Sequence, residues 1–178
     1  MRELGYEKLQ LIFAGHCNSG DWFCEQIKQT LGKYAHELRG QIKLAVLPTY
    51  DLEIALRMVT GCDVWLNNPI QPMEASGTSG MKAALNGGLN LSILDGWWIE
   101  GYNMNPLAGW RFGTNYAENN NNSSDLDALE LYKNLEDVIH CYYHDRKQWT
   151  ARMKAAIALL AFFNTNRVLV EYDQKIWE

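Results

Sequence analysis

The sequence predicts an α/β fold built on an open, doubly wound parallel sheet, followed by helices. Over the first two thirds of the chain, short apolar runs rich in β-forming residues alternate with amphipathic stretches. A β-α-β-α-β-α-β order of this kind implies parallel strands joined by right-handed crossovers. Hydrophobic residues make up 47% of the 178 positions, which is enough to bury a core in a domain of ordinary size.

The first strand is expected at Leu9 to Gly15, a short apolar run closed by a glycine. A helix should follow over Asp21 to Leu38, where apolar residues recur at near-helical spacing, and Gly40 should stop it. The remaining expected elements are a strand at 41–47, a helix at 52–59, a strand at 62–66, a helix at 74–85 after a Gly-rich stretch, and a strand at 89–94. Sheets of this kind bind ligands beyond the carboxyl ends of their strands.

The character of the sequence changes after Asp95. Residues 96–116 are rich in Gly, Asn and Trp, and the polar run at 119–124 is interpreted as a mobile surface loop. Asp125 is expected to be a helix N-cap, followed by amphipathic helices at 126–143 and 149–163 and a last amphipathic segment at 167–177. The predicted organisation is a ligand-binding domain at 1–118, a polar loop at 119–124 and a helical extension at 125–178.

Charge and hydropathy argue against two classes of partner. The net charge is −5 and the longest basic run is Arg146-Lys147, so nothing concentrates positive charge against a nucleic acid. No stretch reaches the roughly 18 apolar residues needed to cross a bilayer, and residues 1–15 lack the features of a signal peptide. We therefore expect a cytoplasmic protein that binds neither nucleic acid nor a membrane.

The four cysteines are well separated and form no Cys-x-x-Cys pair. This spacing favours neither a disulfide framework nor a zinc site. We expect all four to be reduced, partly buried thiols: Cys17, Cys24, Cys62 and Cys141.

Residues 74–88 (EASGTSGMKAALNGG) are the most informative segment. They lie between a predicted strand end and the first turns of a helix, where unpaired backbone N–H groups and the helix dipole favour an anion. Gly77 and Gly80 let the backbone approach a ligand closely. Hydroxyl donors come from Ser76, Thr78 and Ser79. These features predict a phosphate-binding turn.

Two ionisable side chains flank this turn. Lys82 falls one helical turn inside the helix, so its amine can reach a group held at the helix start, through a Schiff base or a charge contact. Glu74 precedes the turn and can accept hydrogen bonds from the hydroxyls of a polar substrate.

The run EASGTSGMKAALNGG resembles the pyridoxal-phosphate attachment segment of the α-glucan phosphorylases, which act on glycogen, starch and maltodextrin. The similarity extends to IFAG at 12–15, to Tyr50 with Asp51, to GCDVWLN at 61–67 and to LSILDGWWIEGYN at 91–103. The ending FNTNRVLVEYDQKIW at 163–177 also resembles the family's closing helix. The resemblance covers nearly the whole chain, but only as the back part of a longer enzyme.

This resemblance implies a Rossmann-like C-terminal domain of the glycosyltransferase-B fold with a helical extension. It implies that Lys82 is the catalytic residue that binds pyridoxal phosphate as a Schiff base, with Thr78, Ser79 and Tyr50 beside the cofactor. The turn that grips the glucosyl unit would be formed by Glu74, Ala75, Ser76 and Gly77. The implied reaction is reversible phosphorolysis, in which orthophosphate attacks the terminal α-1,4 bond of a glucan and releases α-glucose 1-phosphate with retained configuration.

The chain also departs from the family pattern. By this resemblance, we expect the sequence to start after a family segment whose Arg and Lys side chains hold the two phosphates together, and to lack the family's N-terminal half. Two phosphate dianions a few ångströms apart repel by several kcal/mol at intermediate dielectric. We therefore expect the isolated chain to be inactive, with the N-terminal half as its natural partner and a homodimer in the full enzyme.

Four other interpretations remain open. The chain could be a non-catalytic truncated remnant or a split-enzyme subunit. Ser79-Gly80-Met81-Lys82 also fits the Ser-x-x-Lys pattern of serine acyl enzymes, although no Lys-Thr-Gly or Ser-Asp-Asn partner accompanies it. His140 and His144, four residues apart on a predicted helix, could bind a metal, but a solvated helix face is the favoured interpretation. Trp97 and Trp98 could stack on sugars, but packing is favoured.

Overall fold

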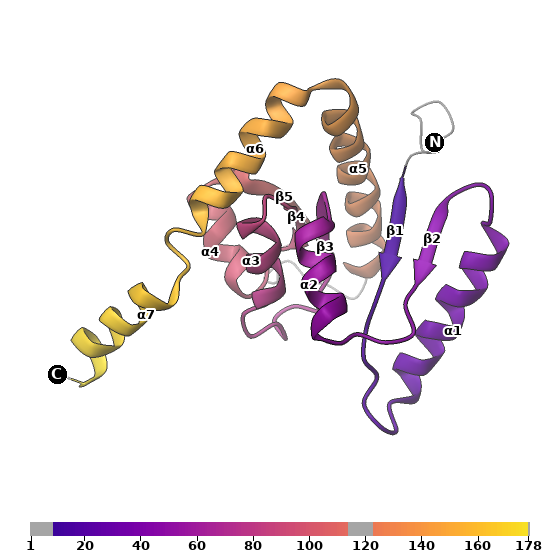
Figure 1. Ribbon diagram of the computed structural model, residues 1–178, viewed down its shortest axis with the longest axis horizontal. Helices are drawn as coiled ribbons and strands as arrows, with labels where there is room; N and C mark the ends of the chain where they lie inside the picture. The colour runs from indigo at the N-terminus through magenta and orange to yellow at the C-terminus, as the bar shows by residue number, and fades with distance from the viewer. Residues whose placement is uncertain (1–8, 114–122, 178) are drawn as a thin grey trace. The chain divides into compact units, whose positions relative to one another are not determined.

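In the part of the chain that the structure describes, five short strands form two parallel sheets, one in each half (Figure 1). The computed structural model describes residues 9–113 and 123–177. Its contacts divide the chain into two compact units, residues 1–57 (unit 1) and 58–178 (unit 2). The predicted domain limits at 118 and 125 stay a prediction. Residues 119–122 of the expected polar loop lie outside the described residues, whereas Ser123 and Ser124 belong to a helix.

Unit 1 is a β-α-β arrangement. Strand β1 (Gln10–Phe13) pairs in parallel with β2 (Lys43–Val46), so that Gln10 lies opposite Lys43 and Phe13 opposite Val46. Helix α1 (Trp22–Glu37) connects them and begins at its N-cap Asp21, whose side chain accepts a hydrogen bond from the Cys24 N–H. The predicted strand-helix-strand order is therefore confirmed in this unit. Helix α2 (Leu52–Gly61) crosses the boundary between the units.

Unit 2 holds a three-stranded parallel sheet in the order β3-β4-β5 (Figure 1). The central strand β4 is buried along its whole length, because elements of unit 2 cover both of its faces. The elements around it are β3 (Val64–Asn67), α3 (Thr78–Leu85), β4 (Leu89–Ile93), α4 (Trp97–Met104), the 3-10 turn η3 (Pro106–Ala108) and β5 (Gly109–Phe112).

The parallel α/β class is confirmed, but the predicted single doubly wound sheet is not. Strand hydrogen bonds join β1 to β2 and β3 to β4 to β5, in two separate sheets. Helix α4 and strand β5 received no assignment from the sequence. The four residues of β5 include Gly109 and Arg111, which obscure the strand pattern, and β5 is recognisable only through its pairing with β4.

The last part of unit 2 is helical. Helix α6 begins after its N-cap Asp145 and is tied to β5 by Arg152, which donates to the Gly109 carbonyl at 3.1 Å and covers the Trp110 ring. The expectation that Asp125 is an N-cap is wrong, because α5 already begins at Ser123 and places Asp125 in the first helical turn. The helices are α5 (Ser123–His144), α6 (Arg146–Leu159) and α7 (Thr165–Tyr172), with the π-helical turn η5 (Asp173–Trp177) at the end.

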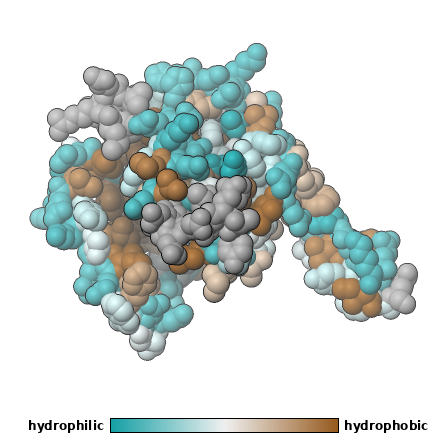
Figure 2. All heavy atoms as spheres, turned by 180° about the vertical axis from the view of Figure 1, so that it is seen from behind, coloured by the Kyte–Doolittle hydropathy of each residue, from teal (hydrophilic) through white to brown (hydrophobic). Residues whose placement is uncertain are grey.

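Helix α7 and η5 contain no buried residue. Figure 2 shows hydrophobic groups among hydrophilic ones on this segment, at the right of the view. The exposed apolar side chains there are Leu169, Val170, Tyr172, Ile176 and Trp177. Within the described residues, no helix combines the length and the hydropathy that a membrane span requires.

Candidate active site

With the exception of Tyr50, every predicted site residue lies between β3 and β4 of unit 2. The helix in this segment begins at Thr78 and not at Glu74 as predicted. Gly77 is the reason, because its φ of +83° is left-handed and interrupts the helical path. Residues 74–77 therefore form a turn ahead of α3.

The start of α3 has no side-chain cap. Its N-cap is Gly77, which offers no side chain to the N–H groups of the first turn. A Cβ added to Gly77 would lie 2.8 Å from Oε1 of Glu74, so the Glu74 carboxyl group lies beside this glycine. The unpaired N–H groups favour an acceptor or an anion at this position.

The buried face of α3 is fixed against β4. A Cβ on Gly80 would lie 2.5 Å from Oδ1 of Asn90, so only glycine permits this approach. Nδ2 of the buried Asn90 donates to the Gly80 carbonyl at 3.1 Å. Ala83 and Ala84 are buried on the same side of the helix. This face sets the position of α3, and with it the direction in which the next side chains point.

Lys82 is exposed on α3, outside that buried face. Its amine makes no hydrogen bond or ion pair with the residues that the structure describes, and its backbone carbonyl accepts from Nδ2 of Asn86 at 2.8 Å. Thr78 is also exposed, and Ser79 is half-buried. Lys82 is therefore not sealed among apolar neighbours, and its amine is accessible to a reagent.

The loop that follows β4 holds the 74–77 turn. Oδ2 of Asp95 accepts from the Glu74 N–H at 3.0 Å, and the Trp97 N–H donates to the Ser76 carbonyl at 2.9 Å. The sequence assigned no site role to Asp95, although it lies in one of the stretches that carried the family resemblance. No local pattern indicates this contact, because the hydrogen bond joins residues 21 positions apart.

Tyr50 is half-buried and lies in unit 1, between β2 and α2. The other predicted site residues lie in unit 2. The role of Tyr50 beside a cofactor therefore stays a prediction.

The family model for carbohydrate phosphorylase matches residues 3–130. The chain belongs to this family. It is 41% identical to the glycogen phosphorylase of Aquifex aeolicus over 176 residues and 42% identical to the maltodextrin phosphorylase of Thermococcus litoralis over 170 residues. These alignments cover 95% and 94% of this chain but only 25% and 20% of the relatives.

A third relative, the glycogen phosphorylase of Mycobacterium tuberculosis, is 41% identical over 141 residues, which are 79% of this chain and 16% of that protein. The chain thus spans a quarter or less of the length of these phosphorylases. The resemblance noted in the sequence is confirmed at the level of the family.

The tryptophan pair of this phosphorylase-family chain is part of its core. Trp97 and Trp98 are buried, with ring centroids 5.1 Å apart, and Trp97 also packs edge-on against Phe163. The favoured interpretation, packing and not sugar stacking, is confirmed. The rings of His140 and His144 lie 5.1 Å apart on α5, but no group of three metal-binding side chains occurs among the described residues.

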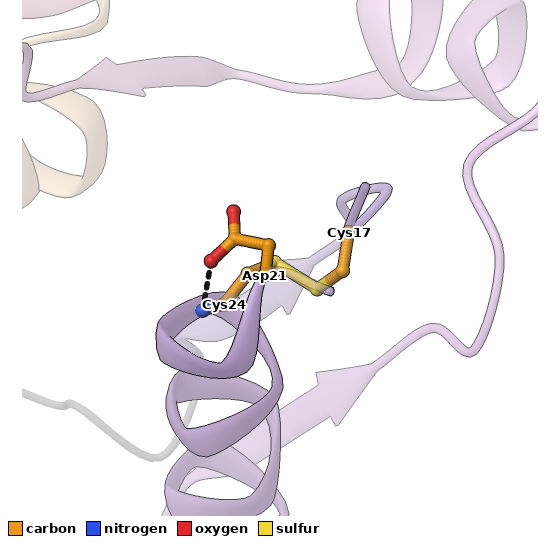
Figure 3. Close-up of a disulfide and its surroundings, with 3 residues drawn as sticks. All are labelled: Cys17, Asp21 and Cys24. Atoms are coloured by element: carbon orange, nitrogen blue, oxygen red, sulfur yellow. Dashed lines mark hydrogen bonds between the residues drawn. A yellow bond between two sulfur atoms is a disulfide. The ribbon is translucent and has the colours of Figure 1, made fainter. Parts of the chain in front are cut away.

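The expectation of four reduced thiols is wrong for two cysteines. Cys17 and Cys24 form a disulfide, with their Cα atoms 5.6 Å apart (Figure 3). The start of α1 explains the pairing, because Asp21 caps the helix and places Cys24 in its first turn, facing the loop that carries Cys17. Spacing alone could not show this, since a separation of seven residues matches no redox motif.

The other two cysteines are free thiols, as expected. Burial raises the pKa of the half-buried Cys62 thiol. Burial also raises the pKa of the buried Cys141 thiol, and the positive charge of Arg152 opposes this rise. Neither thiol is activated as a nucleophile, because both shifts favour the protonated form.

Proposed function

We propose that this chain is the pyridoxal-phosphate-binding and glucosyl-binding part of an α-glucan phosphorylase. One observation carries the proposal: the accessible amine of Lys82 lies one turn after a helix start that no side chain caps, behind the turn Glu74–Gly77. The family membership and the similarity to a glycogen phosphorylase and a maltodextrin phosphorylase support the same function.

The donor set of α3 fits pyridoxal phosphate. A primary amine can attach covalently to the aldehyde of the cofactor, and Lys82 offers one without a competing partner among the described residues. The N–H groups at Thr78 and Ser79, together with the Ser79 hydroxyl, are donors suited to a phosphate monoester. Tyr50 would lie beside the cofactor.

The reaction proposed for the parent enzyme is reversible phosphorolysis of a terminal α-1,4 glucan bond. The bond between the anomeric carbon and the glycosidic oxygen breaks, a bond between that carbon and a phosphate oxygen forms with retained configuration, and the shortened glucan takes up a proton. When bound, pyridoxal phosphate would supply a phosphate group able to donate a proton to, and accept one from, the substrate phosphate. Glu74 accepts hydrogen bonds from sugar hydroxyls, and the N–H groups of Ala75, Ser76 and Gly77 donate to the substrate.

The isolated chain is not expected to complete this reaction. Cofactor phosphate and substrate phosphate repel each other by several kcal/mol at intermediate dielectric, so cations must compensate them. In this proposal those cations come from the remainder of a phosphorylase. This segment is the C-terminal domain of the glycosyltransferase-B fold of that enzyme, and the full enzyme is a homodimer. Release of α-glucose 1-phosphate from maltoheptaose by the chain alone would contradict this part of the proposal.

Cofactor capture can be tested directly. The chain is mixed with pyridoxal phosphate, its near-ultraviolet and visible absorbance is recorded, and the adduct is reduced with borohydride and mapped by mass spectrometry. We expect a single predominant adduct on Lys82. The adduct should disappear in Lys82→Arg, which keeps the positive charge but removes the primary amine.

A matched control uses Lys154→Arg, because Lys154 is an exposed lysine on α6 of the same unit. This variant should keep the Lys82 adduct. Equal modification of many surface lysines, unchanged in Lys82→Arg, would indicate a remnant without a cofactor site. Labelling of Ser79 by a β-lactam would instead favour the serine acyl enzyme.

A cytoplasmic location also belongs to this proposal. Cytosolic thiols are kept reduced, so the Cys17–Cys24 disulfide would be exposed there to reducing agents. Fractionation of cells under alkylating conditions would show both where the chain is located and whether this disulfide is closed.

A further inference from the structure

We infer that Asp95 is a positioning residue that holds the 74–77 turn in the orientation that binds a glucosyl group. This inference rests on the proposed function, since it concerns the sugar-binding part of the same site. Asp95 lies two residues after Ile93, the last residue of β4, just beyond the carboxyl end of the buried central strand, and is itself only 6% exposed.

The carboxylate of Asp95 joins two segments of the backbone. Oδ1 accepts from the Gly96 N–H at 2.9 Å, and Oδ2 accepts from the Glu74 N–H at 3.0 Å. None of the ion pairs in the described part of the chain includes Asp95. Its buried charge is therefore stabilised by backbone N–H groups, in hydrogen bonds that are stronger than those between neutral groups.

Two further contacts join the same segments. The Trp97 N–H donates to the Ser76 carbonyl at 2.9 Å, and Nε2 of Gln71 donates to the Leu94 carbonyl at 2.7 Å. A Cβ on Gly96, whose φ is +52°, would lie 2.4 Å from the Ser76 carbonyl oxygen. Asp95 thus fixes the beginning of the turn, while Gly96 lets the backbone at Ser76 come close.

The contacts that hold the proposed sugar-binding turn differ from those that position Lys82. The turn that carries Glu74 is held by the loop after β4, whereas Lys82 is positioned by the contact between Gly80 and Asn90. A fixed turn binds a sugar without first losing conformational freedom. Loss of the Asp95 carboxylate should therefore weaken sugar binding and leave cofactor attachment at Lys82 unchanged.

The test uses the full ¹⁵N-labelled chain and the variant Asp95→Asn, whose side chain has one oxygen in place of two. We expect the Glu74 amide to exchange with solvent about tenfold faster or more, as the loss of a hydrogen bond to a charged acceptor predicts. Titration with α-glucose 1-phosphate should shift the Ser76 and Gly77 amide signals, with a several-fold weaker Kd in the variant. Unchanged exchange at Glu74 and an unchanged Kd would overturn the inference.

The control is Asp145→Asn. Asp145 also accepts a backbone N–H with its carboxylate, at the start of α6, and asparagine is an equally good N-cap. This variant should match the wild type in both measurements. Should Asp95→Asn not fold, Gly96→Ala perturbs the same turn at a neighbouring contact, because the added methyl group displaces the Ser76 carbonyl.

Borohydride trapping separates this inference from the proposed function. If Asp95→Asn or Gly96→Ala binds the sugar less tightly but keeps the Lys82 adduct, the result supports the positioning role. Parallel loss of sugar binding, the adduct and the circular dichroism of the fold would overturn that role in favour of a general structural one. Absence of the Lys82 adduct from the wild-type chain would contradict the proposed function, while the exchange at Glu74 still decides whether Asp95 holds the turn.

Discussion

Unit 1 and unit 2 have similar strand-helix-strand patterns but very different cores. Among residues 9–57, no side chain is buried, and Trp22 and Phe23 are 68% and 61% exposed. In unit 2, Trp98 and Trp149 are almost fully buried around the β3-β4-β5 sheet. A two-stranded sheet with one helix cannot enclose apolar side chains, whereas three strands covered by helices can. Periodicity predicts an element, but it does not predict how completely that element is covered.

The largest expected difference between the units is seen when one tryptophan in each is replaced by alanine. Trp149→Ala should lower the free energy of unfolding of unit 2 by about 3–5 kcal/mol, because it leaves a cavity beside Trp110 and Tyr142. Trp22→Ala should change the stability of unit 1 by less than about 0.5 kcal/mol, because that side chain is already in water. Urea unfolding followed by amide signals from each unit measures both values. A large loss in Trp22→Ala would show that this face of α1 is covered in solution.

Reduction of the disulfide should affect unit 1 alone. Because the linked cysteines are seven residues apart, loop-closure entropy predicts a loss of about 2–3 kcal/mol when the bond opens. Hydrogen exchange in α1 should therefore accelerate with dithiothreitol, while exchange in β4 stays unchanged. The double variant Cys17→Ser, Cys24→Ser serves as the control, and its exchange should not respond to dithiothreitol. Equal acceleration of hydrogen exchange in α1 and β4 would contradict the expectation that the disulfide stabilises unit 1 alone.

Alanine substitution at two glycines, one in each unit, is expected to change the stability in opposite directions. A Cβ on Gly109 would lie 2.4 Å from the Asn90 carbonyl and 2.8 Å from the Trp98 ring, so Gly109→Ala should cost about 1–3 kcal/mol. A Cβ on Gly32, inside α1, meets nothing within 4 Å. Gly32→Ala should therefore stabilise unit 1 by up to about 1 kcal/mol through helix propensity. Thermal unfolding of the two variants shows whether stability falls in Gly109→Ala and rises in Gly32→Ala.

The smallest expected effect concerns the pH dependence of Cys62 in unit 2. Burial raises the pKa of this thiol in the folded chain, so less of the reactive thiolate is present at a given alkaline pH. The raised pKa stabilises the fold at pH values below the thiol pKa of the unfolded chain. That contribution is lost as the pH rises through the higher pKa of the folded chain.

Iodoacetamide labelling across the alkaline range should show that Cys62 reacts more slowly in the folded chain than in urea. The midpoint of its pH profile should also lie at a higher pH. Identical profiles in the folded and unfolded chains would contradict burial of this thiol.

Local patterns predicted most elements well but placed some boundaries wrongly. The helix expected at Asp21–Leu38 occurs at Trp22–Glu37, because its N-cap and its apolar spacing are local signals. The start of α3 was misplaced by four residues, since the positive φ of Gly77 becomes evident only in the folded backbone. Strand β5 had no signal of its own, because it depends on pairing with β4.

In the candidate site, too, features with local signals were predicted and features that depend on distant contacts were not. Lys82 and the 74–77 turn were predicted as site residues from a contiguous motif, since groups suited to bind an anion at a helix start are neighbours in the sequence. Asp95 was not identified, because its partner Glu74 is distant along the chain. The disulfide was missed for a similar reason, since it depends on how the start of α1 faces the preceding loop.

The sequence alone therefore determined the α/β class, the phosphorylase family and the segment that carries Lys82. These features depend on local propensity and on contiguous motifs, which require no knowledge of distant contacts. The tertiary structure decided which strands pair, which side chains are buried, which cysteines are bonded and which carboxylate holds the turn. Each of these depends on atoms brought together by folding, and the energy of such contacts is determined by distance in space and not by separation along the chain.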